Sequence, residues 1–278
     1  MQRILIPTDF SKNAWNATEY ALQFFKHQKI TFYFVHIDIS MQAHRDEDLH
    51  HSGLCSVRAT TEDNKSKMDS WMETVCTRQS NANHQYKDSI IQAPFVDGIR
   101  NFIAKNEIDF VVMGTKGASG LKEMTIGSKT SAVITRVKCP MLVIPENASF
   151  TKPLSIGFPT DFNMLYKQRI MRTLLEITHM HHSALKVLRV AQTQKPLANF
   201  QDANRDFLKQ QLKDVPHSFH VIENPSLETA LQLFVDSLQI DMVAMIAKNL
   251  NFLQRILFRP KVAQISYHID IPFLVLHE

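Results

Sequence analysis

Short apolar runs alternate with longer amphipathic stretches along this chain. Runs such as Phe110–Met113 are continuous, which is typical of strands buried on both faces of a parallel sheet. Between the runs, apolar residues recur at helical spacing, as at Ala14, Ala17 and Ala21, which follow Ser11 as a helix N-cap. Because strands alternate with helices, we expect a parallel sheet wound by right-handed crossovers. The predicted strands of the first half are 3–7, 31–37, 87–91, 109–114 and 141–144, and the predicted helices are 12–26, 60–79, 94–106 and 127–136.

The second half of the chain repeats the first. Ile6–Phe10, which contains Pro-Thr-Asp-Phe, recurs as Phe158–Phe162, an offset of 152 residues. Glu107–Met113 recurs as Gln239–Met245, an offset of only 132 residues, so the first copy carries extra residues between 40 and 65. A period this long indicates duplicated domains. We expect two α/β domains, 1–147 and 153–278, each a doubly wound five-stranded parallel sheet with helices on both faces.

The composition narrows the class of protein. The net charge of +4 comes from scattered lysines and arginines, so no dedicated nucleic-acid surface is expected. No apolar run reaches the roughly 18 residues that a membrane span needs, and the N-terminal segment lacks the pattern of a signal peptide. Three cysteines without a CxxC pair favour reduced thiols and a cytoplasmic protein.

Four of the seven glycines lie in the segment from Gly114 to Gly127. This glycine loop follows a predicted strand and leads into a predicted helix, and ligands of parallel sheets bind at the carboxyl ends of strands. Gly114 and Gly117 would let the backbone approach an anion closely. Gly127 and Ser128 would open a helix whose free N–H groups favour phosphate, with Thr130 as a further hydroxyl donor. The alternative is that these are ordinary turn glycines.

Three features together resemble the universal stress protein family in its tandem, two-domain form. They are the start Pro-Thr-Asp-Phe-Ser at 7–11, the strand end Val35–Asp38, and the glycine loop that runs on to Cys139–Ile144. The resemblance covers nearly the whole chain apart from residues 40–65, and the glycine loop marks the family's ATP-binding branch. It implies five parallel strands in the order 3-2-1-4-5 in each domain, association through the last strand, and binding of ATP or AMP by proteins that are not clear catalysts.

The resemblance also assigns ligand contacts to four groups of residues. The ends of the first, second and fourth strands would meet the nucleoside, and the glycine loop would hold the outer phosphates, with or without Mg²⁺ bound through them. Lys116 occupies a variable motif position, which leaves its role open. The assigned residues are Pro7, Thr8 and Asp9 by the adenosine, His36 and the backbone of Ile37 at the adenine, Met113 and Gly114 at the ribose and inner phosphate, and Gly117, Gly127, Ser128 and Lys129 at the outer phosphates.

The second copy departs from this pattern. Ile246 brings a β-branched side chain to a position that needs close backbone approach, and Pro260 removes an N–H donor. Asp161 persists, and we interpret it as a cap of the following helix. We therefore expect one nucleotide per chain, in the first copy. The residues aligned with Gly114, Gly117, Gly127 and Ser128 are Ile246, Asn249, Arg259 and Pro260.

Other clusters of titratable residues match no known site. Asp38 lacks a convincing base partner, and neither a Ser-His-Asp order nor paired carboxylates stand out, so no catalytic residue and no metal ligand is assigned. The polar insertion at 40–60 is expected to be a mobile loop near the end of the second strand. His44, His50 and His51, together with Cys55, are interpreted as part of a solvated loop. His179, His181 and His182 are interpreted as residues near the end of a helix.

Three functions remain open from the sequence. The first is a stress or regulatory protein in which an adenine nucleotide biases conformation or partners. The second is a slow ATPase, although the glycine loop lacks the Gly-Lys-Ser/Thr of a Walker A motif. The third is an interaction module that no longer binds nucleotide.

The final strands 141–144 and 273–277 would each leave an open edge, so we expect a pseudo-dimer of the two domains within the chain, with a homodimer as a further option.

Overall fold

The computed structural model describes residues 2–39, 53–115, 127–191, 196–224, 226–247 and 271–277, with the side chains of 53–61 and 228 outside the description. The chain divides into two compact units. Unit 1 ends at Phe150, and unit 2 begins at Thr151.

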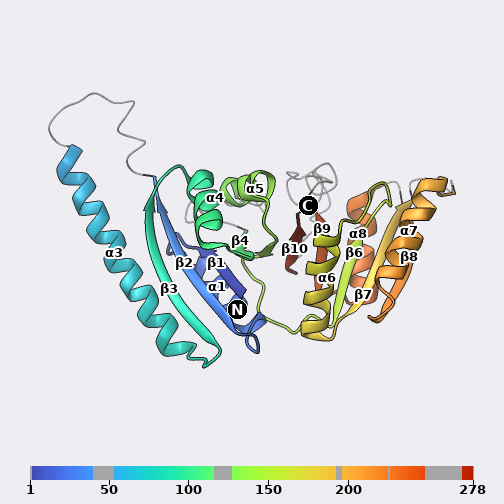
Figure 1. The fold of residues 1–278 in the computed structure, drawn as a ribbon, viewed down its shortest axis with the longest axis horizontal. Coiled ribbons are helices and arrows are strands. Elements are labelled where there is room, and N and C mark those ends of the chain that lie inside the picture. Colours follow the sequence, from blue (N-terminus) through green and yellow to red (C-terminus); the bar gives the residue numbers. More distant parts are fainter. Residues whose placement is uncertain are drawn as a thin grey trace. The chain divides into compact units, whose positions relative to one another are not determined.

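A parallel sheet of five strands forms the centre of unit 1 within the described residues (Figure 1). The strand order is β3-β2-β1-β4-β5, so the direction of winding reverses between β1 and β4. In Figure 1, α3 lies on one side of this sheet, and α4 and α5 lie on the other. The strands are β1 (Gln2–Pro7), β2 (Ile30–Asp38), β3 (His84–Gln92), β4 (Phe110–Gly114) and β5 (Met141–Ile144). The helices are α1 (Lys12–Phe24), α3 (Gly53–Arg78), α4 (Phe95–Asn106) and α5 (Ser128–Arg136).

The central strands are apolar because both of their faces are covered. Ile4, Leu5 and Ile6 of β1 are all 0% exposed, as expected for a strand with neighbours on both sides and helices on both faces. α1 begins as predicted, since the hydroxyl of Ser11 accepts a hydrogen bond from the N–H of Ala14 at 3.2 Å. Such a cap contributes about 1 kcal/mol.

α3 begins earlier than the sequence pattern predicted. The expected start was near residue 60, whereas the helix starts at Gly53. Its C-terminal half is anchored by Met68, Trp71 and Val75, which recur at helical spacing and are buried. Once a helix is anchored, each further residue adds a hydrogen bond at little cost, and no glycine or proline interrupts residues 54–78. Residues 53–60 of the expected mobile loop are therefore helical, which corrects that prediction, and its part at 40–52 lies outside the described residues.

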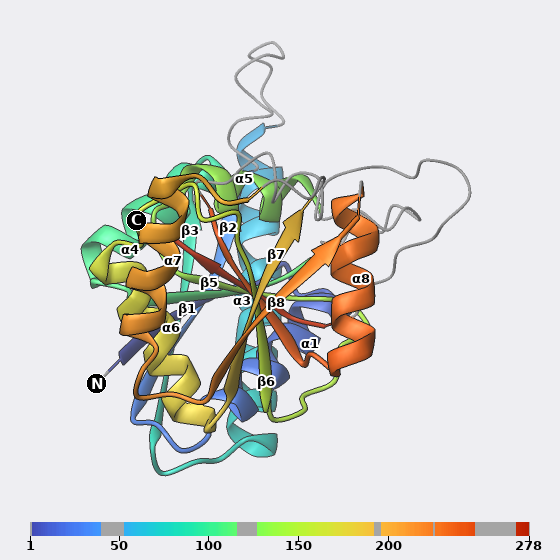
Figure 2. The same cartoon turned by 90° about the vertical axis from the view of Figure 1, so that its right-hand side faces the viewer.

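Unit 2 repeats the topology of unit 1. Its described strands are all parallel, in the order β8-β7-β6-β9-β10. Figure 2 shows α6 and α7 on one face of this sheet and α8 on the opposite face. The prediction of a doubly wound sheet in the order 3-2-1-4-5 is therefore confirmed for both halves of the chain. The elements are β6 (Ser155–Pro159), α6 (Gln168–His181), β7 (Ala184–Ala191), α7 (Asn199–Gln211), β8 (His217–Glu223), α8 (Leu227–Leu238), β9 (Met242–Ile246) and β10 (Phe273–Leu276).

The extra residues of the first copy go largely into α3. This helix has 26 residues, whereas α7, its counterpart between the second and third strands of unit 2, has 13. The segment after β5 packs back on α1, where Asn16 Nδ2 donates to the carbonyl oxygens of Pro145 and Ala148 at 3.1 and 3.0 Å. The residues that follow β5, as far as Ala148, thus pack on unit 1.

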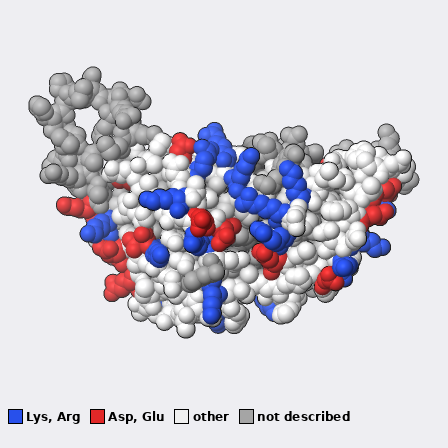
Figure 3. All heavy atoms as spheres, in the orientation of Figure 1, with Lys and Arg blue, Asp and Glu red and all other residues white. Residues whose placement is uncertain are grey.

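The surface charges of unit 1 are mixed. Figure 3 shows lysine and arginine side chains over the face of α4 and α5, with aspartate and glutamate side chains among them. Among the described residues, no helix has the length and the apolar character that crossing a membrane requires.

Candidate functional site

The turn between β1 and α1 is fixed by its own hydrogen bonds. The N–H of Thr8 donates to the carbonyl oxygen of Val35 on β2 at 2.9 Å. Phe10 has a φ of 61°, in the left-handed region, and its N–H donates to Thr8 Oγ1 at 3.0 Å. The N–H of Ser11 donates to Asp9 Oδ1 at 3.1 Å. Together these bonds hold the half-buried carboxylate of Asp9 at the carboxyl end of β1.

His36 lies beside this turn at the end of β2. Its Nδ1 is 2.9 Å from the carbonyl oxygen of Thr8, and its ring stacks on Phe10 with the ring centroids 4.6 Å apart. Because a carbonyl oxygen only accepts, Nδ1 is the donor of this bond. The next residue, Ile37, is 5% exposed. His36 therefore joins the ends of β1 and β2.

Gly114 ends β4 where α1 crosses closest to the strand. A Cβ at this position would lie 2.8–2.9 Å from the side-chain atoms of Asn13, closer than such atoms approach. The carbonyl oxygen of Gly114 accepts a hydrogen bond from Thr130 Oγ1 at 2.8 Å. The need for glycine here follows from the packing of α1 against β4. The hydroxyl of Thr130, expected as a ligand donor, is used within the protein.

The glycine loop returns to the sheet at Gly127. The N–H of Gly127 donates to the carbonyl oxygen of Thr115, the residue after β4. Gly127 is the N-cap of α5, and no side chain caps this helix. The first N–H groups of a helix have no partner within the helix, so the start of α5 offers donors to an anion. Ser128 is exposed at this end.

Lys129 makes a contact that the sequence did not indicate. Its Nζ lies over the ring of Phe95, at the start of α4, 5.1 Å from the ring centroid. This cation–π contact holds the ammonium group at the same end of the sheet as Gly127. No sequence signal could have paired the two residues, because their contact depends on how α4 and α5 pack together.

The topology brings the assigned residues to one edge of unit 1. All of them that fall in the described part of the chain lie at the carboxyl ends of β1, β2 and β4 or at the start of α5. Gly117 and Lys116 lie outside the described residues. The residues gathered at this edge are Pro7, Thr8, Asp9, His36, Ile37, Met113, Gly114, Gly127, Ser128 and Lys129.

Asp38 has a partner that sequence reasoning missed. Its side chain is 6% exposed, and its Oδ2 accepts a hydrogen bond from Asn64 Nδ2 on α3 at 3.2 Å. The carbonyl oxygen of Asp38 also accepts from the N–H of Ala93 at 3.2 Å. These bonds attach α3 and the start of the α4 segment to the end of β2. The register of α3, which only packing fixes, decides that Asn64 meets Asp38.

Unit 2 repeats the backbone of the turn but fills it with its own side chains. The N–H of Thr160 donates to the carbonyl oxygen of Leu188 at 2.8 Å, and Phe162 has a φ of 56°. Here, however, the hydroxyl of the buried Tyr166 lies 2.7 Å from Thr160 Oγ1. Gln201 Nε2 on α7 donates to the carbonyl oxygen of Asp161 at 2.9 Å. Burial raises the pKa of the Tyr166 phenol, which therefore stays protonated as a donor.

The positions of the second copy that align with the glycine loop are only partly described. Ile246 ends β9 and is 7% exposed, so its side chain is part of the core. Asn249, Arg259 and Pro260 lie outside the described residues. The sequence expectation of a bulky residue at the strand end is therefore met, and the loop beyond it is not described.

Other titratable groups have structural surroundings. Within the described residues, no three His, Cys, Asp or Glu side chains are grouped as metal ligands. Burial lowers the pKa of His84, and its Nε2 lies 3.1 Å from the carbonyl oxygen of Phe25, which partly offsets the shift. Cys139 is 2% exposed, with its Sγ 3.8 Å from the carbonyl oxygen of Ile108. His44, His50 and His51 lie outside the described residues.

Solved structures share this fold over the length of the chain. One is a universal stress protein from Archaeoglobus fulgidus DSM 4304, at 15% identity over 99% of this chain and 98% of that one, with a TM-score of 0.69. Another, from Pseudomonas aeruginosa UCBPP-PA14, has 12% identity over 99% of this chain and 93% of that one, with a TM-score of 0.58. Identities this low support the fold and not the ligand. A search of curated protein sequences finds no significant match.

The sequence of unit 1 identifies the family. A family model described as the universal stress protein family matches residues 1–145, which is more than half of the 278 residues. The matched region contains the turn after β1, the end of β2, the end of β4 and the start of α5. The chain belongs to the universal stress protein family.

Proposed function

We propose that unit 1 binds an adenine nucleotide, ATP or AMP, at the carboxyl edge of its sheet, and that binding serves a regulatory or stress-response role. The observation that carries this proposal is the start of α5. This helix begins on a glycine without a side-chain cap, and Gly127 is bonded to the residue that follows β4. The winding reverses between β1 and β4, and open parallel sheets bind ligands at the carboxyl ends of strands where this reversal occurs.

The neighbouring groups fit the parts of a nucleotide. The carboxylate of Asp9 is an acceptor suited to ribose hydroxyls, and the backbone of Ile37 with the ring of His36 would meet the adenine. The N–H groups at the start of α5, with the hydroxyl of Ser128, suit phosphate oxygens. Lys129 adds positive charge nearby. Mg²⁺ would be held through the phosphates, where it would neutralise part of their charge.

The geometry of unit 2 supports one nucleotide per chain. The space beside its Thr-Asp-Phe turn holds the phenol of Tyr166, whose hydroxyl is bonded to Thr160. The carbonyl oxygen of Asp161 already accepts a hydrogen bond from Gln201 Nε2. A nucleoside at this turn would have to displace a buried aromatic side chain, and such a displacement costs a few kcal/mol.

We also propose how the units associate and where the protein works. β5 and β10 are the last strands of their own sheets, and an unpaired edge exposes backbone N–H and C=O groups. We propose that the two units form a pseudo-dimer through these strands, with a homodimer of chains as the alternative. The cytoplasm, where cysteines stay reduced, is the proposed location.

A matched pair of variants tests the nucleotide site. Asp9 and Asp161 occupy equivalent turns, and each Oδ1 accepts a backbone N–H two residues on, at 3.1 and 3.0 Å. Asparagine keeps that acceptor, so Asp9→Asn and Asp161→Asn both preserve the turn. Loss of the charged acceptor for the ribose should weaken ATP binding by Asp9→Asn by roughly ten- to a hundredfold. Asp161→Asn should bind ATP like the unchanged protein.

Isothermal titration with ATP and with AMP measures the affinity and the stoichiometry. Equal affinities for the two variants would refute the site. Absence of any binding heat at either nucleotide would favour the pure interaction module. Steady release of phosphate over hours, lost in Asp9→Asn, would favour the slow ATPase instead of a binding protein.

A further inference from the structure

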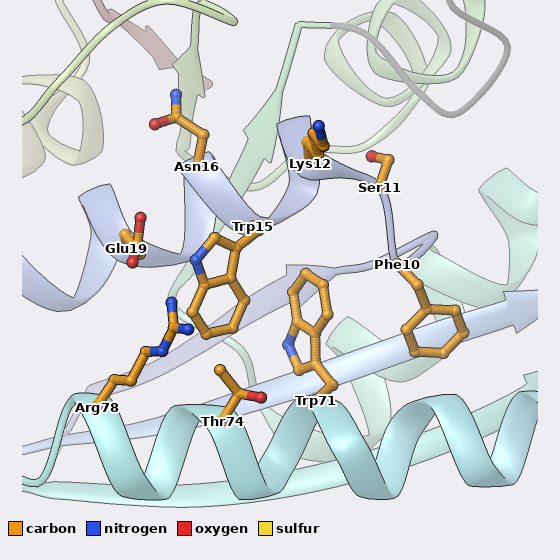
Figure 4. Close-up of a pocket in the computed structure, with 9 residues that line it drawn as sticks. All are labelled: Phe10, Ser11, Lys12, Trp15, Asn16, Glu19, Trp71, Thr74 and Arg78. Atoms are coloured by element: carbon orange, nitrogen blue, oxygen red, sulfur yellow. The ribbon is translucent and has the colours of Figure 1, made fainter.

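A groove runs between α1 and α3 of unit 1, apart from the start of α5 (Figure 4). It is an open groove with a volume of about 540 Å³. Three aromatic side chains, Phe10, Trp15 and Trp71, line it together with polar and charged residues of both helices. No residue assigned to the nucleotide lines this groove, although Phe10, which lines it, stacks on His36.

The aromatic side chains form a preorganised floor. The ring centroid of Trp71 lies 5.0 Å from that of Trp15, with an interplanar angle of 84°, and 6.0 Å from that of Phe10. Edge-to-face arrangements of this kind are favourable and hold the rings in place. Trp71 is 8% exposed, and its Nε1 is buried without a hydrogen-bond partner in the described part of the chain. The groove thus has an aromatic floor, and the unpaired Nε1 of Trp71 is buried from solvent.

Positive charge lies at the rim. Lys12 starts α1 and Arg78 ends α3, and both are exposed. In the described residues, neither side chain forms an ion pair, although both line the groove. Figure 4 shows the guanidinium of Arg78 turned from α3 towards α1, on the side of Trp15 and Glu19. Glu19 is the one acidic side chain among the lining residues, which leaves an excess of positive charge.

We infer that the α1–α3 groove is a second ligand site, which takes a small aromatic carboxylate. The ring of such a ligand packs on the half-buried indole of Trp15, beside the small exposed part of Trp71. Its carboxylate meets Arg78, whose planar fork of donors matches the two oxygens of a carboxylate. Lys12 adds a second positive charge at the rim. A neutral ring would lack the ion pair, and an aliphatic acid would lack the planar contact.

The two tryptophans make the site observable directly. The protein has two tryptophans in total, and both line the groove. In a spectrum of the ¹⁵N-labelled full chain, the two indole N–H signals both come from residues that line the groove. Phenylacetate is the probe, with phenylacetamide as the neutral analogue and cyclohexylacetate as the aliphatic analogue. We expect phenylacetate to shift both indole signals saturably and to bind at least several-fold more tightly than either analogue.

Variants at exposed positions identify the charge that matters. Arg78→Gln should weaken phenylacetate binding about tenfold, since it removes a charge-assisted contact. Glu19→Gln should strengthen binding, because it removes a negative charge from the rim. Arg100→Gln, an exposed arginine of α4 outside the groove, is the matched control and should leave binding unchanged. Far-UV circular dichroism checks that each variant is folded.

Several results would overturn the inference. They are the absence of a saturable shift of either indole signal, equal binding of phenylacetamide, and an affinity of Arg78→Gln equal to that of Arg100→Gln. Titration of Gly127→Val separates the groove from the nucleotide site, since phenylacetate should bind this variant unchanged. Loss of binding in Gly127→Val would place the carboxylate at the start of α5 and refute the groove as its site.

Discussion

Replacing Gly127 by valine should abolish nucleotide binding while the fold survives. Gly127 has φ −57° and ψ 149°, a conformation that any L-amino acid adopts, so valine strains no backbone. Gly127 has no side chain that caps the helix, so its replacement removes no capping hydrogen bond. Glycine is nevertheless a better N-cap than valine, so we expect a loss of stability of at most about 1 kcal/mol.

The effect on binding should be much larger than the effect on stability. A valine side chain would stand beside the first N–H groups of α5, where the phosphate oxygens are proposed to lie. Each hydrogen bond to a charged group contributes roughly 1.5–3 kcal/mol. Loss of one such bond weakens binding by about ten- to a hundredfold, and loss of two removes measurable affinity for a micromolar ligand.

Titration calorimetry with ATP and urea unfolding measure the two effects separately. Ser226→Val is the matched control, because Ser226 is the N-cap of α8 and its hydroxyl accepts the N–H of Thr229 at 3.2 Å. This variant should lose about 1 kcal/mol of stability and bind ATP normally. Unchanged ATP affinity in Gly127→Val, or two nucleotides per chain, would refute the assignment of the phosphate site.

Two further changes test the packing. Gly114→Ala should lower the free energy of unfolding of unit 1 by about 1–3 kcal/mol, because its Cβ would lie 2.8–2.9 Å from the Asn13 side chain. Urea unfolding followed by tryptophan fluorescence measures this loss, and an unchanged midpoint would contradict it. Burial, with a smaller effect from Arg169, lowers the pKa of His277 to about 4. Since the unfolded pKa is about 6.5, stability should be full above that pH and fall by up to about 3 kcal/mol as the pH drops towards 4. The variant His277→Leu should lose less stability over this pH range, as measured by unfolding followed with far-UV circular dichroism. An equal loss of stability in the variant would show that other groups cause it.

The local pattern of the sequence was enough to predict the strands and helices, whereas the order of the strands came from the resemblance. Buried parallel strands need continuous apolar runs, and helices between them need an apolar stripe, so both leave a periodic signal. The internal repeat then predicted that the two halves share one topology. The pattern was weakest at the start of α3, because helix growth away from a packed anchor needs no apolar periodicity. That start, near 60 by the pattern, lies at Gly53.

The candidate site likewise has a part that the sequence predicted and a part that it did not. The turn after β1 was predictable, since Thr8, Asp9 and Ser11 make bonds within a few residues of one another. The gathering of the ends of β1, β2 and β4 at one edge also followed from the strand order. The resemblance and the glycine spacing pointed to the start of α5, which the structure leaves without a side-chain cap.

Contacts between elements distant in sequence were decided by the tertiary structure alone. The bond from Asn64 to Asp38, the position of Lys129 over Phe95 and the fit of Asn13 against Gly114 each depend on how a helix lies on the sheet. The phenol of Tyr166 beside Thr160 likewise depends on the path of the segment before α6. Local sequence sets the period and ends of an element, whereas its rotation and its neighbours are set by packing of the whole unit, and so the second ligand groove between α1 and α3 could be found only in the structure.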